Sequence, residues 1–269
     1  MAQISTGQFI AEVTRKEYIT DHFIRVYLYS PEVHLFKNTT IGDNNKIAIP
    51  PVGVSEVHFP TIENDEWVYP PKEVAPTIRT YTHRGIDLEK NEVFIDFVDH
   101  GDGGPASKWA REAEAGAKLG VMMRLDGKEL YPDAEWYLLA GDATAIPVLS
   151  VILETLPETA KGVCIIEVHG KEDEQILETK ADIEFKWLHN NQPQISSEIA
   201  DVVKSIDIPE TSKFGYVACE FLSVKEIRTY LRKEKNWTSK ELYAFSYWKA
   251  GKAENESQAD RHEEKESIA

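Results

Sequence analysis

The hydrophobic pattern of the chain changes near residue 131, and this change limits the fold more than any other feature of the sequence. Before it, short runs rich in β-branched and aromatic residues are separated by clusters of Pro and Gly, which is typical of a small antiparallel barrel or sandwich. We expect strands over residues 23–29, 46–49, 78–81 and 93–98. A helix is expected over residues 105–115, because Pro105 follows a pair of glycines and Gly116 ends the pattern.

After residue 131 the apolar residues form unbroken runs that alternate with helix patterns. The runs cover residues 136–141, 162–168, 185–188 and 214–219. The helix patterns cover residues 145–154 and 223–235. Continuous apolar strands that alternate with helices predict a parallel sheet covered on both faces. We therefore expect one domain over residues 1–131, a second over residues 132–251, and an acidic tail over residues 252–269 that is flexible or loosely helical.

Charge and cysteine content exclude several classes of protein. The chain has 30 Lys plus Arg and 46 Asp plus Glu, a formal net charge of −16, which disfavours nucleic acids and anionic membranes as partners. Cys164 and Cys219 lie in apolar runs and are too few to ligate an iron–sulfur cluster, and no spaced His or Cys pairs indicate a bound metal. We expect a cytoplasmic protein, because the sequence has neither a signal-peptide pattern nor a membrane-spanning pattern. We also expect it to be a monomer.

The segment Asp99–Ala110 has the composition of an anion-binding turn. Gly101, Gly103 and Gly104 precede the expected helix, and Ser107 lies in its first turn. Backbone N–H groups at a helix start, together with a nearby hydroxyl, can hold a phosphate or diphosphate. An ordinary glycine-rich turn explains the same residues equally well.

A second polar segment lies on the expected strand that precedes this turn. Alternation places Arg79, Tyr81 and His83 on one face of the strand. The other face carries Thr80, Thr82 and Arg84. A guanidinium can hold a diphosphate bidentately, a phenol ring can stack on a planar ring, and a hydroxyl can hydrogen-bond a heteroaromatic edge. A solvated strand face is the simpler explanation when this segment is considered alone.

Together with two later segments, these residues resemble the siderophore-interacting protein family of the ferredoxin–NADP reductase superfamily. The resemblance spans about residues 5–251 and rests on Arg79-x-Tyr81-Thr82-x-Arg84, Asp96–Ala110, Leu139–Pro147 and Tyr247-Trp248-x-x-Gly251. Members of the family are flavin-dependent reductases of ferric siderophores. The resemblance implies an N-terminal antiparallel Greek-key barrel that binds FAD, followed by a Rossmann-like parallel-sheet domain similar to those that bind NAD(P)H. It also implies that electrons pass from NAD(P)H or a reduced ferredoxin through FAD to Fe(III).

The resemblance implies an FAD site residue by residue. Arg79 is expected at the diphosphate, Tyr81 on the isoalloxazine ring and Thr82 near its N5 atom. The full set of expected FAD-binding residues is Arg79, Thr80, Tyr81, Thr82, Arg84, His100, Gly101, Asp102, Gly104, Ala106, Ser107, Trp109 and Trp248. Trp248 belongs to this set because a C-terminal aromatic residue often covers one flavin face in the superfamily, although burial in the core explains it equally well. No catalytic residue beyond the flavin is required, because the cofactor carries the redox chemistry.

The electron-donor site is expected at the turn after the first strand of the second domain. The residues that match the family there are Gly141, Asp142, Thr144, Ala145 and Pro147. This turn lacks the Gly-x-Gly-x-x-Gly fingerprint, and Asp142 places a negative charge where a phosphate would lie. The donor therefore stays open between NAD(P)H as a co-substrate and a ferredoxin.

A local excess of bases indicates where an anionic substrate would bind. Bases outnumber acids between Lys225 and Lys252, although much of this excess fits the solvated face of an amphipathic helix. Tyr247, Lys249 and Lys252 are the expected contacts for an anionic ferric catecholate or hydroxamate complex. Two other functions stay open: a flavin reductase with another electron acceptor, and a siderophore-binding flavoprotein without turnover.

Overall fold

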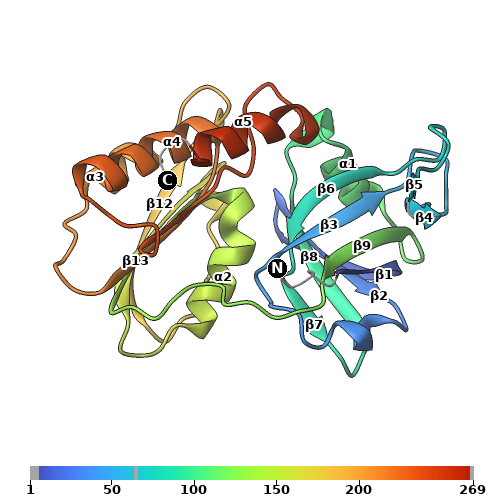
Figure 1. Ribbon diagram of the computed structural model, residues 1–269, viewed down its shortest axis with the longest axis horizontal. Coiled ribbons are helices and arrows are strands. Elements are labelled where there is room, and N and C mark those ends of the chain that lie inside the picture. Colours follow the sequence, from blue (N-terminus) through green and yellow to red (C-terminus); the bar gives the residue numbers. More distant parts are fainter. Residues whose placement is uncertain (1–5, 64–65, 267–269) are drawn as a thin grey trace. The chain divides into compact units, whose positions relative to one another are not determined.

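The computed structural model describes residues 6–63 and 66–266, and its contacts divide the chain into two compact units between Leu130 and Tyr131 (Figure 1). Unit 1 contains an antiparallel sheet, and unit 2 contains a parallel sheet. This confirms the predicted fold class. In the described ranges, no helix is long and apolar enough to cross a membrane.

The sheet of unit 1 is built from strands that alternate between buried and exposed residues. Its seven strands are β1 (Thr6–Thr20), β2 (Phe23–Tyr29), β3 (Asn44–Ile49), β6 (Thr77–Thr82), β7 (Gly85–Asp87), β8 (Glu92–Val98) and β9 (Lys118–Arg124). A separate two-stranded ribbon is formed by β4 (Thr61–Glu63) and β5 (Glu66–Val68). The order in the sheet is β6-β3-β9-β1-β2-β8-β7, and β6 also contacts β8, so that the sheet curls into a half-barrel. In β1, for example, Phe9, Ala11 and Val13 are buried in the core, while their neighbours are exposed.

Helix α1 (Pro105–Glu112) links the glycine-rich turn to the core of unit 1. It follows a short helical turn over Gly101–Gly103 and has a proline in its first turn, where the missing N–H group is tolerated. Ala106 and Ala110 are buried in the same core cluster as Phe97 of β8. The helix ends three residues before the predicted end, at Glu112. The start of α1 is therefore held rigidly beside β8.

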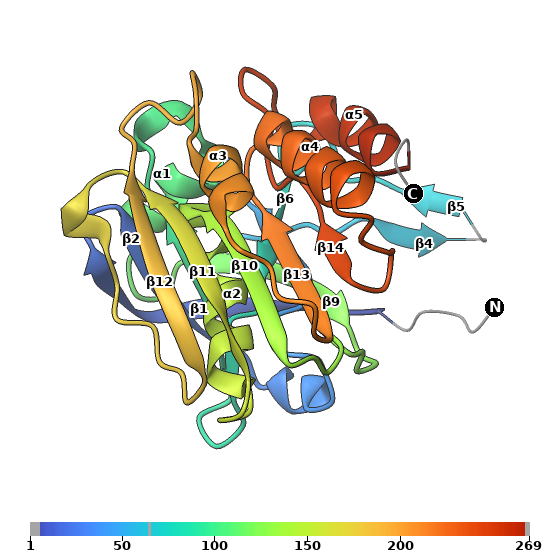
Figure 2. The same cartoon turned by 90° about the vertical axis from the view of Figure 1, so that its left-hand side faces the viewer.

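Unit 2 is a parallel sheet with helices on both faces. Its elements are β10 (Trp136–Asp142), α2 (Ile146–Thr155), β11 (Lys161–Val168), β12 (Asp182–His189), α3 (Ile199–Ser205), β13 (Lys213–Ala218), α4 (Phe221–Thr229), β14 (Leu242–Ala244) and α5 (Glu254–Glu266). The order of the strands is β12-β11-β10-β13-β14. Helix α2 lies on one face of this sheet, whereas α3 and α4 lie on the other (Figure 2). The central strands are buried on both sides, which is why they read as unbroken apolar runs.

The predicted tail requires a correction. Residues Glu254–Glu266 form helix α5, where the sequence predicted a segment that is flexible or only loosely helical. Arg261 is buried and donates hydrogen bonds to the carbonyl groups of Ser246 (3.3 Å) and Tyr247 (2.9 Å). Glu264 forms an ion pair with Arg228 of α4, and both side chains are buried. The sequence indicated at most a loose helix, because the residues that the helix buries are polar.

Candidate functional site

Strand β6 and helix α1 of unit 1 both carry predicted FAD-binding residues, and an aromatic residue of β8 joins them. The ring centroid of Tyr81 on β6 lies 4.6 Å from that of Phe97 on β8. The ring of Phe97 lies 5.7 Å from that of Trp109 on α1. Tyr81 and Trp109 are both partly buried against the core of unit 1. The structure therefore brings the Arg79–Thr82 strand and the helix after the glycine-rich turn together at Phe97.

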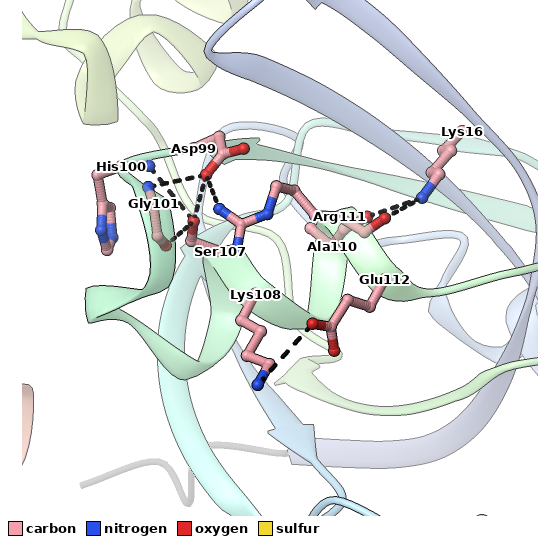
Figure 3. Close-up of polar contacts among 9 residues, drawn as sticks. All are labelled: Lys16, Asp99, His100, Gly101, Ser107, Lys108, Ala110, Arg111 and Glu112. Atoms are coloured by element: carbon pink, nitrogen blue, oxygen red, sulfur yellow. Dashed lines mark hydrogen bonds and ion pairs between the residues drawn. The ribbon is translucent and has the colours of Figure 1, made fainter.

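Asp99 organises the glycine-rich turn between β8 and α1 (Figure 3). Its carboxylate accepts hydrogen bonds from the N–H group of Gly101 (3.0 Å), the hydroxyl of Ser107 (2.7 Å) and the guanidinium of Arg111 (2.9 Å). Gly101 has a φ angle of 82°, which favours glycine. Ser107 is buried, and its hydroxyl also accepts a hydrogen bond from the N–H group of His100 at 3.3 Å. The Ser107 hydroxyl is therefore engaged inside the turn.

The Asp99 carboxylate is stabilised in its charged form. Partial burial raises the pKa of Asp99, but hydrogen bonds from Ser107 and Gly101 and the charge of Arg111 outweigh this effect, so that the pKa is lowered. Sequence reasoning missed Asp99 and Arg111 as parts of the site. The one available signal was an Asp two residues before a glycine, which is typical of a turn in which the side chain accepts a backbone hydrogen bond.

The start of α1 leaves backbone N–H groups available to an anion. Gly104 precedes the helix in an extended conformation, and no side chain within the described ranges caps this end. Pro105 has no N–H group, while the N–H groups of Ala106 and Ser107 have no acceptor inside the helix. A Cβ atom at Gly104 would lie 2.4 Å from Cε1 of His100, so the exposed imidazole of His100 lies directly against this backbone.

Arg79 supplies a further donor in unit 1. Its guanidinium is half-buried and donates a hydrogen bond to the carbonyl of Ile78 at 2.8 Å. Among the residues that the structure describes, no carboxylate pairs with it. A guanidinium and backbone N–H groups are the donors that bind a diphosphate, so these residues fit the diphosphate of FAD. The side chain of Asp102, another predicted contact, lies outside the described part of the structure.

The other predicted residues of the strand segment differ in their surroundings. Thr80 is exposed, whereas Thr82 is buried. Nε of Arg84 lies 3.7 Å from the buried carboxylate of Asp96. The same carboxylate binds Arg25 through two hydrogen bonds of 2.6 and 2.8 Å. Arg84 follows β6, so its contact with Asp96 links the end of β6 to β8. Through Asp96, both are also linked to Arg25 on β2.

In unit 2, the predicted electron-donor residues surround the buried carboxylate of Asp142 at the end of β10. Asp142 accepts hydrogen bonds from the N–H group of Thr144 (2.9 Å), the hydroxyl of Thr144 (2.5 Å) and the indole N–H group of Trp248 (2.7 Å). Burial raises the pKa of Asp142, and the hydrogen bonds from Thr144 and Trp248 act in the opposite direction. A Cβ atom at Gly141 would lie 2.4 Å from that of Ala145, so the turn is closely packed.

The two predicted substrate lysines both bind one acid of α5. Nζ of Lys249 lies 2.5 Å from Oδ2 of Asp260, and Nζ of Lys252 lies 2.8 Å from the same atom. The hydrogen bonds from these lysines lower the pKa of Asp260 to about 2. The hydroxyl of Tyr247, the third predicted contact, lies 3.3 Å from that of Tyr216. The sequence contained no signal for Asp260, because it lies in the segment predicted as a tail.

Known protein families match the sequences of both units. The family model described as a siderophore-interacting FAD-binding domain matches residues 12–124, and the one described as a siderophore-interacting protein matches residues 134–251. Ferric vibriobactin reductase ViuB of Vibrio cholerae is 32% identical over 255 residues, which cover 94% of this chain and 93% of that protein.

Two solved structures extend this similarity to the fold. The siderophore-interacting protein SipS from Aeromonas hydrophila is 27% identical, with a TM-score of 0.82 and coverage of 96% of this chain and 98% of that chain. A siderophore utilization protein from T. fusca is 26% identical, with a TM-score of 0.83 and coverage of 93% and 96%. Both similarities include the two units.

Proposed function

This chain belongs to the siderophore-interacting protein family, and on that premise we propose that it is a FAD-dependent reductase of ferric siderophores. Electrons come from NAD(P)H or a reduced ferredoxin, and Fe(III) in the siderophore complex is reduced to Fe(II), which is released in the cytoplasm. The observation that carries the proposal is the similarity, over nearly the full length of both chains, to ViuB, whose name describes a ferric vibriobactin reductase.

The residues of unit 1 are assigned to the cofactor. FAD, when bound, supplies the redox chemistry, since a flavin exchanges electrons both in pairs and singly. Arg79 and the N–H groups of Ala106 and Ser107 hold the diphosphate in this proposal. Asp99 supports them indirectly, because it fixes the turn that sets the direction of the helix start.

The lysines of unit 2 are assigned to the substrate. Lys249 and Lys252 together exceed the charge of Asp260 by one positive unit, which attracts a multiply anionic ferric complex. The ammonium of Lys249 also lies 4.2 Å from the ring centroid of Phe221, so its aliphatic stem is anchored beside an aromatic surface. Fe(II) binds hard oxygen ligands more weakly than Fe(III), so reduction favours release of the metal from the siderophore.

Turnover with competing acceptors tests the proposal. The FAD-loaded protein is given NADH, NADPH or reduced ferredoxin, a ferric tris-catecholate complex, and a chelator that reports Fe(II) by its colour. We expect Fe(II) to form faster than free flavin or a redox dye is reduced under the same conditions. Faster reduction of flavin or dye would favour a reductase with another acceptor, and binding of the ferric complex without Fe(II) would favour a binding protein without turnover.

A further inference from the structure

The carboxyl ends of β10 and β13 form the place where a parallel sheet of this kind binds a nucleotide. The strand order β12-β11-β10-β13-β14 changes direction between β10 and β13. The connections through α2 and α3 run on opposite faces of the sheet, which opens a crevice at this point in doubly wound folds. The residues expected at the electron-donor site lie at this edge.

The turn after β10 offers few backbone donors to a phosphate. The N–H group of Thr144 is bonded to Asp142, and that of Ile146 is bonded to the carbonyl of Ala143. Pro147, in the first turn of α2, has no N–H group. The turn after β8 in unit 1 differs, because two N–H groups at the start of α1 have no acceptor inside the helix. The turn after β10 therefore differs from the turn after β8 in that its Thr144 and Ile146 N–H groups are already bonded within the chain.

Trp248 links the carboxyl ends of β10 and β13. Its carbonyl accepts a hydrogen bond from the N–H group of Phe221 (3.0 Å), and the carboxylate of Glu220 accepts one from Ala250 (3.1 Å). These bonds tie the backbone around Trp248 to the residues that follow β13. The indole N–H group reaches Asp142 at the end of β10 at 2.7 Å. The side chain therefore lies over the edge of the sheet at which doubly wound folds bind a nucleotide.

Negative charge lines the same edge. Glu167 at the end of β11, Asp142 at the end of β10 and Glu220 after β13 are all buried, with exposed fractions of 3%, 6% and 7%. Glu167 accepts hydrogen bonds from Asn190 (3.1 Å) and Ser197 (3.1 Å), so its donors also come from this chain. A phosphate that enters the crevice meets carboxylates whose hydrogen-bond donors are already used.

We infer that Asp142 and Trp248 are specificity-determining residues that keep a nucleotide diphosphate out of the crevice between β10 and β13. The inference rests on the proposed function, because it concerns the electron donor of that reaction. Asp142 opposes the phosphates through its charge, and Trp248 fills the space through its hydrogen bond to Asp142. A pyridine nucleotide enters this crevice only when that bond breaks.

Calorimetric titration of the FAD-loaded protein with ADP and with NADPH tests the inference. We expect both ligands to bind about tenfold or more tightly to Asp142→Asn and to Trp248→Phe than to the wild type, because each change removes one of the two obstacles. Glu135→Gln is the control, since it removes an exposed carboxylate that precedes β10 at the opposite end of the strand and leaves Trp248 bonded to Asp142; the affinity of this variant for both ligands should equal that of the wild type. Equal affinities in the wild type and in both variants overturn the inference.

A readout on the wild type keeps the inference testable if a variant misfolds. The indole ¹⁵N–¹H resonance of Trp248, assigned by triple-resonance spectroscopy, is expected to keep its position when ADP or NADPH is added. A shift of this resonance that saturates at micromolar nucleotide overturns the inference. The proposed function is tested separately with the same preparation, reduced by dithionite and mixed with a ferric siderophore, because Fe(II) formation there requires no nucleotide.

Discussion

At the scale of single residues, Asp99 shows how one carboxylate can order the backbone of a glycine-rich turn. Its carboxylate accepts hydrogen bonds from the hydroxyl of Ser107 and from the N–H group of Gly101. These bonds order the backbone that leads into α1. The hydroxyl of Ser107 is thus used within the turn, whereas its backbone N–H group has no acceptor inside the helix. A structural role of the Ser107 hydroxyl and a direct contact with FAD can be told apart, because only the structural role affects the stability of the protein without FAD.

Ser107→Ala is expected to destabilise the protein whether or not FAD is present. Loss of a buried hydrogen bond to a charged acceptor costs about 1.5–3 kcal/mol of unfolding free energy, which urea titration of the apoprotein and the holoprotein measures. Ser205→Ala, on an exposed position of α3, is the control and should cost little. Weaker FAD binding with unchanged apoprotein stability would instead mean that the hydroxyl contacts the cofactor.

His83 makes the stability of the protein depend on pH. Its imidazole is buried beside Thr39, and burial lowers its pKa from 6.5 to about 4. Between these values the unfolded chain takes up a proton that the folded chain does not, so stability decreases as the pH falls. We expect this residue to contribute a loss on the order of 3 kcal/mol over that range.

Urea titrations at several pH values between 7 and 4 separate this contribution from those of other groups. The stability of His83→Gln should decrease less steeply with falling pH than that of the wild type. His34→Gln replaces an exposed imidazole and should follow the wild type. If the stability of His83→Gln decreases with pH as steeply as that of the wild type, other groups cause the pH dependence.

The predicted site residues show which roles a sequence reveals. Arg79 and the glycines before α1 could be proposed from the sequence, because the chemistry assigned to them depends on residue type and backbone freedom. The partners of Ser107 and Lys249 could not, since they depend on which carboxylate the fold places within 3 Å of them. Those carboxylates, Asp99 and Asp260, have no pattern of their own that marks them.

At the scale of elements, hydrophobic pattern determined what could be predicted. Strands β10 and β11 are buried on both faces, so each is an unbroken apolar run that the sequence reveals. Strand β1 was not among the predicted strands, because its exposed positions carry charged residues between the buried ones. Helix α5 buries Ser257, Arg261 and Glu264, which have helical spacing but no hydrophobicity. Ion pairs with residues outside the helix, rather than burial of apolar side chains, therefore hold α5 in place.

Glu264→Gln is expected to release α5 from α4. It leaves the buried guanidinium of Arg228 without its charged partner, and removal of one partner from a buried ion pair costs about 3–5 kcal/mol. Limited proteolysis measures the release as faster cleavage at Arg261. Glu263→Gln, an exposed change one residue away, is the control. Equal cleavage rates in the two variants would show that the ion pair does not hold the helix.

At the scale of the whole molecule, the net charge of −16 conceals a local balance that the sequence alone misjudges. The excess of bases between Lys225 and Lys252 is offset in the structure by acids of α5. Glu264 pairs with Arg228, and Asp260 pairs with both predicted substrate lysines. The net positive charge of this region is therefore smaller than a count along the chain indicates.

Asp260→Asn is expected to strengthen the attraction for an anionic ferric complex. It frees both lysines from their common acid, so the KM for a ferric tris-catecholate should fall by about two- to fivefold at low ionic strength, with the difference shrinking as salt is added. Steady-state assays at two salt concentrations measure it. Glu263→Gln removes an exposed charge from the same helix, and an identical fall of KM in that variant would contradict a specific role for Asp260.

Single-turnover reduction of a ferric siderophore tests the central claim most directly. The FAD-loaded protein is reduced anaerobically with one equivalent of dithionite and mixed with a ferric tris-catecholate in a stopped-flow instrument, with an Fe(II) chelator present. The account predicts that the flavin absorbance returns as Fe(II) appears, with about two Fe(II) for each FAD. Flavin that stays reduced in the presence of the bound ferric complex would contradict it.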